Sequence, residues 1–310
     1  MVDIRIPEVE QKVIREEYYQ RLVKWIDAKK LWTRLGNVRA NVMMRYMRFY
    51  SQSFFLSPAE ELLNKNNAFD KAFDKEKAEY KSAKGDKKDK TAYGLFISRM
   101  KAIYGGFMQE LDDKGKKNGY WLMEKLNVRV CPYCNRNYTI MVDEDTIKVR
   151  PEYDHFYPET FYPALILSFY NLVPSCLQCN HLKRVKELDV NPWLGYNAGN
   201  RPTFKVDIST GDFPAVPNIL IKNENKNTEK LGIRELYNEH KDYVIEILNK
   251  IQAYNPVTYG AIRKDFQGIV HTEGELERMV WGNYTQGEDA EKRPFAKLTA
   301  DVLEQYKKYL

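Results

Sequence analysis

The chain contains 310 residues, of which 43% are hydrophobic and 30% are charged, and its formal net charge is +6. The hydrophobic content excludes a disordered protein, and the mildly basic balance is compatible with a polyanionic partner but does not require one. The sequence shows no apolar leader near its start and no run of ~20 apolar residues. We therefore expect a cytoplasmic protein without a signal peptide or a membrane span.

Residues 1–126 are predicted to form a helical region. Apolar residues recur at helical spacing within residues 13–26, 42–50 and 95–111. The lysine-rich segment 81–90 predicts an exposed loop. It resembles a phosphate-binding loop only superficially, because Asp89 stands where the second glycine belongs and no apolar strand precedes it. We therefore reject an ATP site there.

Residues 127–193 have a different character. Two short β-like runs, Thr139–Val142 and Thr146–Tyr153, are followed by a proline-marked loop and by an apolar run, Ser168–Val173. A basic helix is predicted over Asn180–Lys186. The expected order is thus strand, loop, strand and helix.

Residues 194–310 are predicted to form a second helical region. A loop segment rich in Gly, Asn and Pro reaches to about residue 223, and one long helix follows, with an apolar stripe from Ile233 to Ile251. Asn255-Pro256 is the expected end of that helix, and the chain closes on an amphipathic segment at 298–306. The fold class is predicted to be α+β, mostly helical, with divisions at 126/127 and 193/194.

All four cysteines of the chain fall in two C-x-x-C pairs. A two-residue gap lets both thiolates of a pair bind one ion, so this spacing predicts a structural zinc site. Two disulfides in a secreted protein are the less favoured alternative. The predicted ligands are Cys131, Cys134, Cys176 and Cys179.

The residues between and beside these pairs suit metal-assisted phosphodiester hydrolysis. His155 is a candidate general base, because a neutral imidazole can take a proton from water near neutral pH. Asp154 and Asn180 supply oxygen ligands for Mg²⁺ or Mn²⁺. Asn171 is expected on the second strand, where it would hold the loop that carries His155.

Three basic residues follow Asn180 and are predicted to meet DNA phosphates: Lys183, Arg184 and Lys186. Each candidate also has a structural interpretation. His155 alone is more often a satisfied structural histidine, Asn180 is well placed to cap a helix, and 183–186 alone is a solvated helix face. The co-occurrence of all of them in one short window favours the functional interpretation.

These residues resemble the HNH endonuclease family. Its pattern of D-H-x-x-P, N-L and C-x-x-C-[HN]-x-x-K is matched by Asp154 to Pro158, by Asn171-Leu172 and by Cys176 to Lys183. The resemblance implies a zinc-stapled ββα-metal finger with His155 as the base, Asp154 and Asn180 as ligands of the catalytic ion, and Asn171 as the orienting residue. The third signature position is Asn180 instead of His, with His181 next to it.

A narrower resemblance suggests partners. The segments around Cys131 and from Asp154 to Cys176 are similar to HNH nucleases of Septu- and retron-type anti-phage systems, which work beside a separate ATPase. DNA and such an ATPase or regulatory subunit are therefore the expected partners. The alternatives are a zinc-stapled nucleic-acid-binding module without catalysis and a protein-interaction scaffold.

Overall fold

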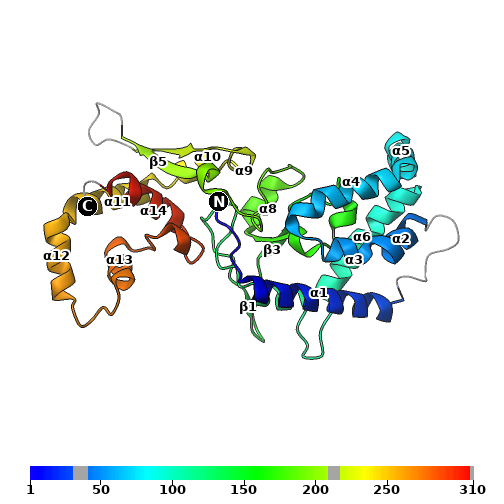
Figure 1. The fold of residues 1–310 in the computed structure, drawn as a ribbon, viewed down its shortest axis with the longest axis horizontal. Coiled ribbons are helices and arrows are strands. Elements are labelled where there is room, and N and C mark those ends of the chain that lie inside the picture. Colours follow the sequence, from blue (N-terminus) through cyan, green and yellow to red (C-terminus); the bar gives the residue numbers. More distant parts are fainter. Residues whose placement is uncertain (31–40, 209–216, 308–310) are drawn as a thin grey trace.

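The computed structural model describes residues 1–30, 41–208 and 217–307, in a molecule that is longer than it is wide (Figure 1). The N-terminal helices lie at one end and the last helices at the other. There are also three small antiparallel hairpins among the described residues. One lies near the middle of the molecule, whereas the strands at 203–207 and 218–222 lie against the C-terminal helices (Figure 1). Helices with small separate sheets confirm the α+β class.

The N-terminal region is helical, as predicted. Aromatic side chains from three helices pack around Tyr46, and the helical stripe Ile14, Tyr18, Leu22 is buried. The helices are α1 (Glu8–Ala28), α2 (Asn41–Arg45), a π-helical turn (Tyr46–Tyr50), α3 (Ser51–Phe55), α4 (Leu62–Ala72), α5 (Asp74–Ser82), α6 (Ala92–Gln109) and α7 (Asn118–Leu126).

Two details of that prediction are corrected. Val13 and Leu111 belong to the predicted apolar stripes, but both are more than half exposed, and Leu111 lies beyond the end of α6. Residues 85–90 are exposed as expected, yet they form a 3-10 helix and not an irregular loop.

The central segment contains two hairpins. The short strands β1 (Val142–Asp143) and β2 (Lys148–Val149) pair with each other. β3 (Glu152–His155) pairs antiparallel with β4 (Leu172–Ser175), with Asp154 opposite Val173 and His155 opposite Leu172. Helix α8 (Leu177–Lys183) follows β4 directly and packs against β3. The predicted order of strand, loop, strand and helix is therefore present.

The C-terminal region departs more from the prediction. The expected loop up to residue 223 contains β5 (Thr203–Asp207) and β6 (Asn218–Lys222), a third hairpin. The single helix expected over 233–251 is two helices that meet at Glu239 and His240. The second of them ends at Ala253, just before the predicted stop at Asn255-Pro256, and Asn255 also caps the start of a further helix. The helices are α9 (Lys226–Lys230), α10 (Ile233–Asn238), α11 (Lys241–Ala253), α12 (Pro256–Asp265), α13 (Glu273–Trp281) and α14 (Ala296–Gln305).

The β3–β4 hairpin lies between two hydrophobic cores. Tyr153 and Leu172 belong to the core of the N-terminal helices. Phe156 and Val173 belong to a second core, which holds the four cysteines and the C-terminal helices. The domain boundaries at 126/127 and 193/194 remain predictions. None of the described helices is long and apolar enough to cross a membrane.

Candidate metal centre and active site

The four cysteines form one buried cluster. Their sulfur atoms all lie within 4.8 Å of one another, and none is in a disulfide. The Cys134 and Cys176 Sγ atoms are 4.0 Å apart. Zn–S bonds of about 2.3 Å in a tetrahedron require sulfur atoms about 3.8 Å apart. The cluster can therefore hold a metal ion such as zinc.

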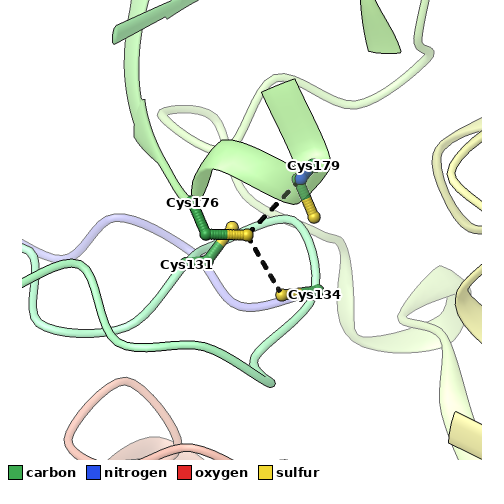
Figure 2. A group of neighbouring side chains, drawn as sticks. All are labelled: Cys131, Cys134, Cys176 and Cys179. Atoms are coloured by element: carbon green, nitrogen blue, oxygen red, sulfur yellow. Dashed lines mark hydrogen bonds between the residues drawn. The ribbon is translucent and has the colours of Figure 1, made fainter. Parts of the chain in front are cut away.

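Local backbone geometry builds this cluster (Figure 2). Cys176 is the N-cap of α8 and Cys179 lies in its first turn, while Cys131 and Cys134 lie on a facing loop. N–H groups point at the sulfurs: Arg136 N is 3.3 Å from Cys134 Sγ, and Asn137 Nδ2 is 3.4 Å from Cys176 Sγ. Such donors stabilise thiolate charge, as expected around a bound cation.

Helix α8 covers one face of the β3–β4 hairpin. Glu152 and Asp154 are two residues apart on β3, so their side chains share that face. Asn180 Nδ2 donates a hydrogen bond to Glu152, and Lys183 Nζ donates to Asp154 Oδ1 at 3.1 Å. Asn180, Glu152 and Asp154 are thereby gathered between the strand and the helix. The amide oxygen of Asn180 is left as the atom available to a cation.

Asp154 is almost fully buried and is held from two sides. Besides Lys183, it accepts a hydrogen bond from the Tyr133 hydroxyl at 2.6 Å. Tyr133 lies between Cys131 and Cys134, so this bond links the carboxylate to the cysteine cluster. Burial and the neighbouring Asp154 charge raise the pKa of Tyr133 well above its usual value, which keeps the hydroxyl protonated as a donor.

Lys183 does not have the position predicted for a DNA contact. Its side chain is fully buried, and its ammonium group also donates to the His155 carbonyl at 2.6 Å. Burial lowers the pKa of Lys183, and Asp154 opposes that effect. An ammonium group enclosed in this way cannot reach a phosphate on the surface, so we assign it to the ion pair with Asp154.

The ring of His155 and the carboxylate of Asp154 have different neighbours. His155 is the last residue of β3, and adjacent strand residues face opposite sides. Its Nε2 is 3.0 Å from the Ile166 carbonyl oxygen, and its ring packs against Tyr104. Because a carbonyl only accepts, Nε2 carries the proton and Nδ1 of the neutral ring has a free lone pair. Burial lowers the pKa of His155, which favours that neutral form.

Asn171 is completely buried and fastens the loop after His155. It lies in a 3-10 turn (Phe169–Asn171) just before β4, not on the strand as predicted. Its Oδ1 accepts from the Tyr157 backbone N at 2.7 Å, and its Nδ2 donates to the Leu165 carbonyl at 3.0 Å. Both ends of the His155-to-Leu165 loop are tied by this one amide.

Asn180 and His181 point in different directions from α8. Asn180 faces Glu152, whereas His181 is exposed and its Nε2 lies 2.9 Å from an Arg184 nitrogen. The helix begins at Leu177 and its N-cap is Cys176, so Asn180 does not cap it. Of the two neighbours, only Asn180 is on the side of the strand.

The remaining predicted DNA contacts are exposed. Arg184 ends α8 with a positive φ of 46°, and Lys186 lies beyond the helix, where its Nζ donates to the Lys230 carbonyl at 2.8 Å. The sequence predicted a continuous basic helix over Asn180–Lys186, but neither residue lies within α8. Both side chains remain accessible to a large anion.

Sequence reasoning missed three contributors to the site. Glu152 precedes Asp154 by two residues. Because alternate residues of a strand share one face, this spacing could have predicted Glu152 beside Asp154. Tyr133 was hidden inside the first cysteine pair. The segment at Val2 and Ile4 gave no signal at all, yet the Val2 N–H donates to the carbonyl of Pro132, between the first two cysteines, and the Ile4 N–H donates to the Pro192 carbonyl.

Comparison with protein-family models, with curated proteins and with solved structures found no match to this chain.

Proposed function

We propose that this protein is a metal-dependent HNH-type endonuclease that hydrolyses DNA. The observation that carries the proposal is the β3–β4–α8 unit, which lies beside a four-cysteine cluster. It holds Asp154 and Asn180 on the face of β3 that α8 covers, and it holds His155 at the end of the same strand on the opposite face. Zinc in that cluster has a structural role. Asp154, Glu152 and Asn180, on the face of β3 that α8 covers, would hold Mg²⁺ or Mn²⁺.

His155 acts as the general base. Its Nε2–H is engaged by the Ile166 carbonyl, so Nδ1 is the atom that takes the proton from the attacking water. This hydrogen bond fixes the orientation of the His155 ring. Asn171 in turn holds the loop that carries the Ile166 carbonyl, because its Nδ2 donates to the neighbouring Leu165 carbonyl. Tyr104 packs against the ring and limits its rotation.

Asp154, Asn180 and Glu152 supply oxygen ligands of the kind that Mg²⁺ prefers. Asp154 uses one lone pair on each oxygen for Lys183 and Tyr133, and a carboxylate has about four such lone pairs. When bound, the ion stabilises charge on the phosphate and on the departing oxygen. Glu152 is an addition to the ligands predicted from the sequence.

A second candidate function is a zinc-stapled binding module without catalysis. The ion pair of Asp154 with Lys183 favours it, because both groups are satisfied without a divalent cation. The arrangement as a nuclease effector beside a separate ATPase rests on the sequence resemblance alone. Co-purification from the native operon tests it, and recovery of the chain alone would count against it.

Plasmid cleavage by the zinc-loaded protein with Mg²⁺ or Mn²⁺ separates the two functions. His155→Ala is expected to lower the rate by about 10²–10⁴-fold, the contribution of a general base. His181→Ala is the matched control, since this exposed histidine lies outside the site. Equal cleavage by His155→Ala would remove the assigned base, and no cleavage by the parent with its native partner present would favour the binding module.

A further inference from the structure

A polar cleft of about 380 Å³ opens beside the proposed ion site. Its walls come from the start of α7, from β2 and from the residues that lead into β3. Lys117, Lys148 and Arg150 line it together with Tyr120 and Glu152. Glu152 also accepts a hydrogen bond from Asn180, so this residue is shared by the cleft and by the proposed ligands of the ion.

Two of the three cations in the cleft have no carboxylate partner among the described residues. Lys148 is paired with Asp143 at 2.8 Å, which also lies 3.8 Å from Lys116. No ion pair within the described ranges involves Lys117 or Arg150. A positive charge without an internal partner is available to an anion from solution.

Arg150 is held in place without a carboxylate. Its guanidinium lies 5.8 Å from the ring centroid of Tyr120 and 5.4 Å from that of Tyr153, and its Nη1 donates to the Pro151 carbonyl at 2.8 Å. Gly119 lies beside this arginine: a Cβ there would be 3.4 Å from Arg150 Nε, an ordinary contact, and 3.1 Å from the Met108 carbonyl oxygen, a tighter one. Aromatic stacking of this kind leaves guanidinium N–H groups free to bind phosphate.

The first turn of α7 faces the same cleft. Lys117 is its N-cap residue and makes no capping hydrogen bond, so the positive end of the helix is not neutralised by a side chain. Three of the first four N–H groups of α7 are already bonded, that of Asn118 to the Glu110 carbonyl and those of Tyr120 and Trp121 to the Lys117 carbonyl. The helix therefore contributes its dipole to the cleft and not a set of free donors. The anion-binding groups are the side chains of two lysines and an arginine.

We propose that this cleft binds the phosphodiester backbone of the DNA strand that enters the active site. The inference rests on the proposed nuclease function and extends it from the reacting phosphate to its neighbours. Lys117 and Arg150 contact phosphates, and Tyr120 offers a ring for a sugar or base. Phosphate contacts of this kind position a strand without reading its sequence.

DNA binding by the full-length zinc-loaded chain tests the cleft. The parent is the His155→Ala protein without added Mg²⁺, which excludes cleavage, and the readout is fluorescence anisotropy of a labelled duplex between about 50 and 200 mM salt. Lys117→Gln and Arg150→Gln are each expected to weaken binding about tenfold. Each is also expected to reduce the salt slope by about 0.9. Lys222→Gln on β6 is the matched control and should bind like the parent.

Unchanged affinity and slope in the Lys117→Gln/Arg150→Gln double variant would overturn the inference, as would a parent that does not bind DNA. Arg150→Lys keeps the charge and should retain the parent slope, which separates charge from packing. If Arg150→Gln does not fold, Lys117→Gln decides alone. This outcome is independent of the cleavage test. If cleavage depends on His155 but the double variant binds DNA like the parent, only the proposal for the cleft is rejected.

Discussion

At the scale of single residues, the buried pair of Lys183 and Asp154 is the most constrained feature of the site. Both side chains are almost completely excluded from water, and both are held by further hydrogen bonds. Removing one partner of such a pair costs more than the pair itself contributes, because the other charge is left buried without compensation.

Lys183→Met tests this pair. The substitution keeps much of the side-chain length and removes the charge, so we expect it to lower the free energy of unfolding by about 3–5 kcal/mol in urea denaturation. Lys186→Met, an exposed neighbour, should change it by less than about 0.5 kcal/mol. Equal stability of the two variants would show that the pair is not buried in solution.

Glu152→Gln tests the added ion ligand. The amide keeps a hydrogen-bond acceptor for Asn180 but removes the charge, so the melting temperature should stay near that of the parent. We expect the Mg²⁺ concentration for half-maximal cleavage to rise roughly 10–100-fold. Glu144→Gln in the exposed β1–β2 turn is the control, and a similar shift in both variants would contradict a specific role.

At the scale of elements, the cysteine cluster ties the start of α8 to the loop before β1. Because the energy of a structural zinc site in a small motif is largely folding energy, removal of the metal should unfold this part of the chain. The cluster thus decides whether Asn180 and Lys183 meet β3 at all.

Cys131→Ser is therefore expected to lose zinc and to melt at a lower temperature than the parent. The measurements are metal analysis and circular dichroism during heating. Leu177→Ala replaces an exposed residue between the cluster cysteines Cys176 and Cys179 and should retain about one zinc per chain. Full zinc content in Cys131→Ser would remove that cysteine from the ligand set.

The prediction of the elements succeeded where one local pattern decides the outcome. The cysteine spacing, the helical stripes of α1 and α14 and the strand–strand–helix order are examples. The prediction failed where contacts between residues far apart in the sequence determine the structure. The stripe from Ile233 to Ile251 continues in phase across the break at Glu239 and His240, so periodicity alone could not show two helices.

The sequence predicted most residues of the candidate site, but it did not predict the contacts that these residues make. Lys183 was expected on a solvated face, but the ridge of α8 that carries Asn180 also carries Lys183 three residues later, toward β3. Placing it inside would have required knowing where α8 begins and which face packs on β3. Tyr133 reaches Asp154 from inside the first cysteine pair, whose spacing indicates the metal ligands but not this hydrogen bond. Val2 bonds to the Pro132 carbonyl from a segment whose local sequence contains no hint of the site.

At the scale of the whole molecule, the segment before α1 joins parts that are distant in the sequence. Ile4 is buried in the core that holds the cysteines, and its N–H group bonds to the Pro192 carbonyl. Ile4→Ala should cost about 2–5 kcal/mol of unfolding free energy, as for other large-to-small core changes. Val9→Ala, at an exposed position on α1, should be nearly neutral, and a small effect of Ile4→Ala would contradict this packing.

The two faces of the β3–β4 hairpin pack against different hydrophobic cores. His155 contacts Tyr104 and the Ile166 carbonyl on the side of the N-terminal core, while Asp154 accepts a hydrogen bond from Tyr133 on the side of the second core. The imidazole and the carboxylate are therefore positioned by different sets of packed side chains. A substitution that shifts one core would change the distance between the two groups without altering either of them.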